Sequence, residues 1–127
     1  MQRLMASMLG ALLVIPTVGM ASEFQVTSPT IKDQSTIGSE HVFNGFGCTG
    51  QNVSPALRWD HAPKDTKSFA VTVYDPDAPT GSGWWHWLVF NIPPGTTGLP
   101  AGAGNPDGAG APSGSIQSMT DFGQPGF

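Results

Sequence analysis

The sequence predicts an all-β fold, an antiparallel sandwich of short strands with at most a minor helix. Residues 68–74 and 87–92 are rich in β-branched and aromatic residues, which favour strands. Seventeen glycines and twelve prolines divide the remaining chain into short segments. After residue 21 no apolar pattern repeats at the helical period of about 3.6 residues. Short strands separated by turns, with no helical period, are typical of a sandwich.

The first 21 residues are interpreted as a secretory signal peptide. Arg3 precedes a mostly apolar run over residues 4–18, and residues 19–21 (Gly-Met-Ala) match a small-x-small cleavage pattern. An uncleaved anchor is the alternative, but the run is short for a membrane span and polar residues follow it at once. We therefore expect a periplasmic or secreted domain over residues 22–127, with no membrane span once the signal is removed.

The charge of the chain excludes some classes of partner. The formal net charge is −4, and the basic residues beyond the leader are Lys32, Arg58, Lys64 and Lys67. Nucleic acids and anionic membranes attract clustered basic side chains, which this sequence lacks. We expect no nucleic-acid partner, no electrostatic docking to a membrane and no cofactor.

Cys48 is the one cysteine of the sequence. An odd cysteine in an exported protein indicates a free thiol, an intermolecular bridge or a partner outside the sequence. Residues 121–127 read as a loop without a closing strand or helix. We therefore expect a domain that is incomplete at its C-terminus.

Six strand segments are expected in the domain. Between the last two of them, residues 95–114 are rich in Gly, Ala and Pro, and long loops of this kind are often functional or mobile. The expected strands cover residues 24–27, 41–43, 56–59, 68–74, 87–92 and 115–119.

The parity of the two strongest strands brings two polar side chains together. Asp75 continues the apolar face of the upstream strand, and His86 shares the parity of Leu88, Phe90 and Ile92 downstream. Antiparallel pairing then places Asp75 and His86 at one rim, both directed inward. Because an unpaired buried charge is costly, such groups need a partner or a ligand. The alternative is an Asp–His pair that satisfies itself within a hairpin.

Catalysis and metal binding have weaker support. Ser82 lies near Asp75 and His86, but in a Gly-Ser-Gly loop rather than the strained turn of a nucleophile. Asp75, Asp77 and His86 lack a spacing dedicated to zinc. We therefore expect neither an enzyme nor a metal site. His41 and His61 are interpreted as ordinary structural residues.

Several motifs, in order, resemble one known family. They are residues 43–48 (Phe-Asn-Gly-Phe-Gly-Cys), 75–79 (Asp-Pro-Asp-Ala-Pro), 84–93 (Trp-Trp-His-Trp-Leu-Val-Phe-Asn-Ile-Pro) and 121–123 (Asp-Phe-Gly). Together they resemble the phosphatidylethanolamine-binding proteins, also called Raf kinase inhibitor proteins, in their compact exported bacterial branch. The resemblance runs from about residue 24 to the last residue.

The resemblance implies a sandwich with Greek-key connections and a small anion-accepting pocket. Asp75, Asp77 and His86 match pocket positions of the family, with Trp84 beside them. The implied ligand is a small anionic or phosphorylated molecule such as phosphoethanolamine. The alternative partner is a protein, a kinase or protease that the chain inhibits.

The same resemblance carries three further expectations. The Ala78–Pro79 bond is expected to be cis. The family's C-terminal strands and helix are expected to be lacking, together with a motif that contributes a further pocket histidine and tyrosine. A cysteine in that absent part is a potential partner for Cys48.

Two carboxylates at an anion pocket require explanation, and three interpretations are open. One carboxyl group stays protonated through like-charge repulsion. Alternatively, Asp75 orients and charges His86 while backbone amides hold the anion, which is the interpretation we favour. In the third, an acid receives the ammonium group of a zwitterion.

Overall fold

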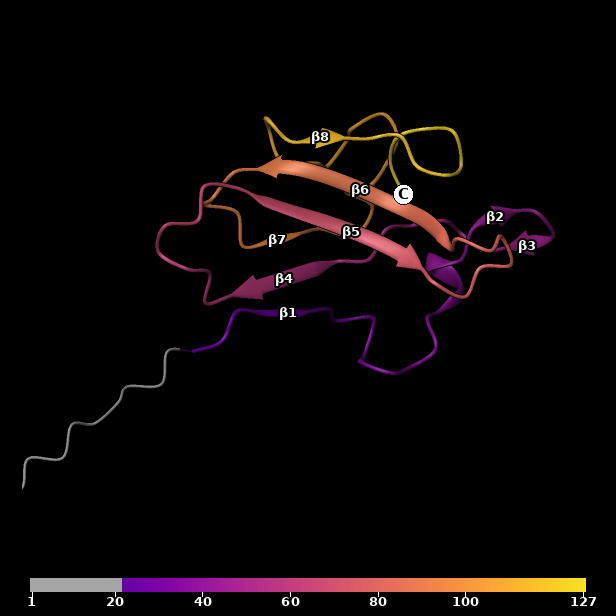
Figure 1. The fold of residues 1–127 in the computed structure, drawn as a ribbon, viewed down its shortest axis with the longest axis horizontal. Helices are drawn as coiled ribbons and strands as arrows, with labels where there is room; N and C mark the ends of the chain where they lie inside the picture. The colour runs from indigo at the N-terminus through magenta and orange to yellow at the C-terminus, as the bar shows by residue number, and fades with distance from the viewer. Residues whose placement is uncertain (1–21) are drawn as a thin grey trace, which may run out of the picture.

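The computed structural model describes residues 22–127, and the predicted signal peptide, residues 1–21, lies outside them. The described residues form two three-stranded antiparallel sheets and a small hairpin (Figure 1). In the first sheet β4 (Leu57–Asp60) lies between β1 (Gln25–Thr27) and β7 (Gly98–Leu99). In the second, β6 (Trp84–Ile92) lies between β5 (Phe69–Asp75) and β8 (Ile116–Gln117). The hairpin pairs β2 (Asn44–Gly45) with β3 (Cys48–Thr49).

The core lies between the two sheets. Trp59 of β4 and Leu99 of β7 pack with Trp87, Val89 and Ile92 of β6. Trp87 is fully buried, and its indole Nε1 donates a hydrogen bond to Gln117 Oε1 at 2.7 Å. The predicted antiparallel β-sandwich is therefore confirmed.

The predicted core face of the downstream strand is partly wrong. Two irregularities interrupt its pairing with β5. Val73 pairs with Trp87 but Tyr74 pairs with Trp85, and the second irregularity lies between Phe69 and Val71. Each extra residue shifts the alternation of faces by one. The buried residues are consequently Trp87, Val89 and Ile92, whereas Phe90 is 43% exposed.

Two other segments also differ from the sequence-based expectation. The strand predicted at residues 41–43 is replaced by a short 3₁₀ helix, η1 (Ser39–His41). The buried His41 ring contacts Val53 O at 2.8 Å and Thr30 Oγ1 at 3.0 Å, which gives it the expected structural role. The loop at residues 95–114 contains β7, and a buried hydrogen bond from Gly104 N to Ser54 Oγ (2.8 Å) fixes it to the core.

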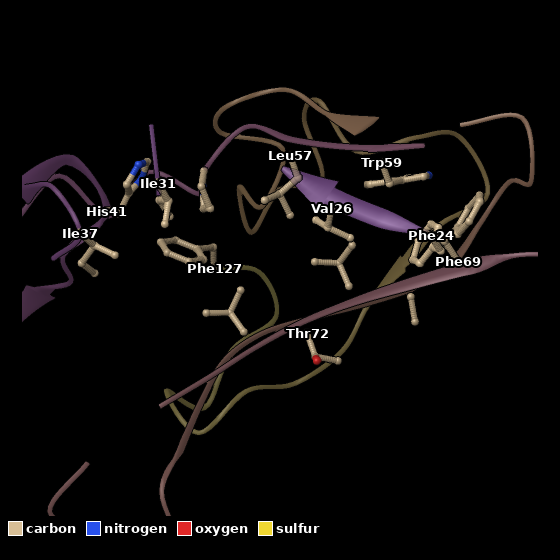
Figure 2. A pocket seen from close by; sticks show the side chains of 14 residues that line it. Phe24, Val26, Ile31, Ile37, His41, Leu57, Trp59, Phe69, Thr72 and Phe127 are labelled. Atoms are coloured by element: carbon tan, nitrogen blue, oxygen red, sulfur yellow. The ribbon is translucent and has the colours of Figure 1, made fainter. Parts of the chain in front are cut away.

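An apolar groove of about 440 Å³ opens between the sheets, where β1 and β4 face β5. Figure 2 shows side chains of the first sheet, among them Val26 and Leu57, above the β5 strand that carries Phe69. Val26 is 57% exposed, and in the described sheet β5 has β6 as its one neighbour. An apolar groove beside an unpaired strand edge favours association with another polypeptide.

The shifted face of β6 can be tested by comparing two substitutions. Ile92→Ala removes a fully buried side chain and is expected to cost about 2–5 kcal/mol of unfolding free energy. Phe90→Ala removes a larger but partly exposed side chain and is expected to cost clearly less. Urea denaturation of both variants measures the difference, and equal or reversed costs would contradict the assigned face.

The open groove leads to a prediction about association. We expect the full chain to self-associate as its concentration rises, because the groove and the β5 edge are exposed together. Sedimentation velocity over a concentration series measures this association. Val26→Thr, which lowers the apolar area of the groove, is expected to weaken it. A chain that remains monomeric throughout the series would refute the prediction.

Candidate functional site

The turn from β5 to β6 is held by bonds within the turn itself. The amide of Asp77 donates to Asp75 Oδ1 at 2.9 Å, so this side chain closes a turn on its own backbone. The amide of Thr80 donates to Ala78 O at 2.7 Å, and the Thr80 hydroxyl donates to Gly83 O at 2.7 Å. The expected cis bond before Pro79 is wrong, because the described residues contain no cis peptide. A three-residue turn closes around Pro79 with the ordinarily preferred trans isomer.

The end of this turn requires a glycine. Gly83 has φ +74°, in the left-handed region, and a Cβ at this position would collide with the Tyr74 hydroxyl. That hydroxyl donates to Ser82 O at 2.6 Å, which anchors the turn to β5. β6 therefore begins directly after this glycine, at Trp84, which pairs with Asp75 of β5.

A pocket of about 430 Å³ lies at this end of the sandwich, between the β5–β6 turn and the β2–β3 hairpin. The two segments lie at the same end of the molecule in Figure 1. Asp75, Trp84 and His86 all line the pocket. The structure thus places Asp75 and His86 in the lining of one pocket, but strand parity alone does not account for the position of His86, and the role of both residues in binding stays a prediction.

The bulge in β6 accounts for the position of His86. Asp75 pairs directly with Trp84, and His86 is the residue left out between the Trp85 and Trp87 pairings. Bulges re-aim side chains at the ends of sheets. The imidazole therefore faces the pocket although the next residue, Trp87, is a core residue.

Two of the candidate residues lie elsewhere. Asp77 is exposed and does not line the pocket, and its backbone amide donates a hydrogen bond to Asp75 Oδ1. Ser82 is exposed and does not line the pocket either, so the grouping of Ser82 with Asp75 and His86 in one pocket does not occur.

Aromatic rings form most of the remaining wall. Phe122 is central to them: its ring centroid lies 4.3 Å from that of Phe43, 5.4 Å from Trp84 and 5.2 Å from His86. Phe46, at the tip of the hairpin, also lines the pocket and is 84% exposed. Sequence reasoning did not assign these phenylalanines to the site. The signal in the sequence that pointed to them was the resemblance of residues 43–48 and 121–123 to motifs of the phosphatidylethanolamine-binding proteins.

Two further features of the wall concern single atoms. The exposed thiol of Cys48 lines the pocket and is free of disulfide bonds. The indole Nε1 of Trp84 is, among the described residues, the buried side-chain polar atom that has no hydrogen-bond partner. An unpaired buried donor costs about 1–3 kcal/mol, so a ligand oxygen that accepts a hydrogen bond from it would remove this cost.

The electrostatics of His86 differ from the favoured expectation. Burial lowers the pKa of His86 below its ordinary value of 6.5, and the smaller, opposite influences of Asp75 and Asp121 do not reverse this. The expectation that Asp75 charges His86 is therefore wrong for the free protein, because loss of solvation outweighs attraction. Asp121 lies outside the pocket lining, where its Oδ2 accepts a hydrogen bond from the Trp85 amide at 2.7 Å.

The lowered pKa of His86 predicts a pH dependence of stability. The unfolded chain takes up this proton at a higher pH than the folded chain. The contribution of neutral His86 to the free energy of unfolding is therefore complete above pH 6.5 and is lost as the pH falls through the folded pKa. NMR titration of the imidazole signals, assigned with His86→Asn, measures the pKa. Asp75→Asn and Asp121→Asn are each expected to lower it further. A value above 6.5 in the free protein would contradict the assignment.

The described residues give no support to a metal centre or a membrane helix. Within residues 22–127 no three His, Cys, Asp or Glu side chains group closely enough to hold a metal ion. In the same range no helix has the length and apolar character needed to cross a membrane.

Comparison with known proteins identifies relatives over most of the chain. The family model described as "Phosphatidylethanolamine-binding protein" matches residues 27–127. The Escherichia coli protein YbcL is 56% identical over 107 residues, which cover 84% of this chain and 58% of YbcL. A second E. coli protein, YbhB, is 52% identical over 103 residues, which cover 81% of this chain and 65% of YbhB.

Solved structures agree with these sequence matches. The crystal structure of E. coli YbcL, described as a new member of the mammalian PEBP family, superposes with a TM-score of 0.81 at 59% identity. The match covers 84% of this chain and 65% of that one. A Chlamydia trachomatis homologue, CT736, gives a TM-score of 0.65 at 27% identity, with 82% and 62% coverage. The chain thus spans about three-fifths of the length of the curated relatives it matches.

Proposed function

Because the chain belongs to the phosphatidylethanolamine-binding protein family, we propose that its β5–β6 pocket binds small phosphorylated ligands of the phosphoethanolamine class. The role proposed is binding and regulation rather than catalysis. The observation that carries the proposal is the convergence of Asp75, Trp84 and His86 on one pocket with an aromatic wall. Small-ligand sites generally combine an apolar wall with a few directed polar groups.

Two donors are available for the oxygens of a phosphate group. The imidazole of His86 donates through its N–H, and a charged imidazolium donates more strongly. The unpartnered indole N–H of Trp84 is a second donor, if a small ring movement exposes it to the ligand. A bound phosphate favours protonation of His86, so affinity for this group is expected to rise as pH falls.

The cellular setting belongs to the same proposal. The leader predicted at residues 1–21 supports a periplasmic or secreted protein, and the scarcity of basic residues supports a small ligand over nucleic acid. A protein target, such as a kinase or protease, stays a prediction of the family resemblance, because no described feature of this pocket favours it.

Calorimetric titration of the full chain with phosphoethanolamine tests the proposal. We expect saturable binding that is tighter at about pH 6 than at about pH 8, because His86 takes up a proton with the ligand. His86→Asn is expected to weaken binding and to remove most of the pH dependence. A suitable control is His61→Asn, because His61 does not line the pocket and asparagine tolerates its positive φ. His61 directly follows β4, which ends at the opposite end of the sandwich from the β2–β3 hairpin (Figure 1).

The proposal fails under two clear outcomes. One is the absence of heat and of any His86 signal shift with millimolar phosphoethanolamine. The other is binding that His86→Asn leaves unchanged at both pH values.

A further inference from the structure

We infer that the free edge of β5 is an interface for a second copy of this chain, and that the two copies pair β5 with β5 in antiparallel orientation about a two-fold axis at Val71. The pairing joins the second sheets of the two copies into one continuous sheet. The interface is separate from the proposed ligand site: of residues 67–75, which pair across it, Asp75 alone lines the β5–β6 pocket.

β5 is an unusually long and regular edge strand for this fold. It contains seven residues, whereas the other edge strands of the two three-stranded sheets, β1, β7 and β8, contain three, two and two. Both irregularities of the β5–β6 pairing put the additional residue in β6, so β5 itself is regular. Edge strands are usually protected by proline, lysine or a bulge, and none of these occurs between Phe69 and Asp75. An edge of this kind is a template for another strand.

The apolar groove runs along the same edge. Its lining contains five consecutive residues of β5, residues 69–73. Because successive residues of a strand point to opposite faces, such a lining follows the edge of the strand rather than one of its faces. Phe24, Val26 and Ile37 are exposed in the same groove (Figure 2). When two copies pair about an axis perpendicular to the sheet, both grooves open toward the joint, and their exposed apolar side chains lose contact with water.

The side chains on the core face of this segment are complementary to themselves. Lys67, Phe69, Val71, Val73 and Asp75 share one parity, in the order base, three apolar residues, acid. In an antiparallel pair centred on Val71, Lys67 lies opposite Asp75 of the partner subunit. Phe69 lies opposite Val73 of the partner subunit, and Val71 opposite its own counterpart. Opposite charges and aromatic or β-branched residues are favourable pairs at directly opposed positions, and a two-fold axis repeats each off-axis contact.

The neighbouring registers lack this match. A two-fold axis at Thr72 places the Asp75 carboxylate opposite Phe69 of the partner subunit. An axis at Ala70 places it opposite Asp65 of the partner subunit, and like charges at opposed positions are destabilising. The order of charges and apolar residues therefore selects the axis at Val71.

The register is tested with two cysteine variants of the full chain, each combined with Cys48→Ser. In Val71→Cys the two thiols lie directly opposite each other, and oxidised glutathione is expected to convert most of the associated chains into a covalent dimer. Thr72→Cys is the matched control, because each of its thiols faces Ala70 of the partner subunit. It is expected to cross-link roughly tenfold more slowly, since its two Cα atoms lie beyond the reach of a disulfide. Electrophoresis without reductant measures both rates.

A charge reversal tests the ends of the pairing. Lys67→Glu places an acid opposite Asp75 of the partner subunit and is expected to raise the dissociation constant of the dimer roughly tenfold, because two symmetric contacts become repulsive. Lys64→Glu makes the same change of net charge outside the paired residues and is expected to leave the constant unchanged. Both lysines are exposed, so neither variant puts folding at risk. Sedimentation velocity over a concentration series measures the constants.

Each contrary outcome overturns the β5 pairing. A chain that remains monomeric overturns it, and so does a dimer in which Val71→Cys does not cross-link. Faster cross-linking of Thr72→Cys than of Val71→Cys overturns the register. Association that Val26→Thr weakens but Lys67→Glu does not indicates contact through the groove alone and also overturns the strand pairing. Binding of phosphoethanolamine is measured independently of these outcomes, so the proposed function stands or fails separately.

Discussion

The pairing of β5 with β6 is the constraint on which the rest of the structure depends. At one point Val73 faces Trp87 while Tyr74 faces Trp85, so that His86 is an extra residue in the ladder. Without this extra residue, strict alternation would direct His86 and Trp87 to opposite faces. The bulge lets one strand supply a fully buried tryptophan to the core and an imidazole to the pocket at adjacent positions. Core packing on one side of the bulge thereby fixes the geometry of the site on the other.

The pocket also depends on segments distant in sequence. The C-terminal turn is closed by two hydrogen bonds between Thr120 and Gln124 and is attached to β6 through Asp121 and the Trp85 backbone. It delivers Phe122 to the centre of the aromatic wall. The β2–β3 hairpin supplies rings from the other side. The site is therefore built from three loops at one end of the sheet, outside the buried core.

Sequence reasoning reached the fold and the position of Asp75 at the pocket for a physical reason. Strand identity and the parity of Asp75 depend on local alternation, which a sequence displays directly. The errors arise where a tertiary feature intervenes. Because of the bulges near His86 and Asn91, Val89 rather than Phe90 lies in the core. Burial lowers the pKa of His86, whereas the sequence-based expectation was that Asp75 would raise it. The positions of Phe46 and Phe122 depend on how loops fold over the sheet end, which alternation does not encode.

The competition between burial and charge at His86 gives the pocket its chemical character. The Phe122 ring packs against the imidazole, with the two ring centroids 5.2 Å apart, and burial lowers the pKa of His86 despite the attraction of Asp75. Burial thereby weakens the attraction of the uncharged imidazole for an anion. Under the proposed function, a phosphorylated ligand therefore brings a proton to His86, or a positive charge of its own that Asp75 receives. A zwitterion satisfies the second condition without any change of pH, because its two charges meet complementary groups in one pocket.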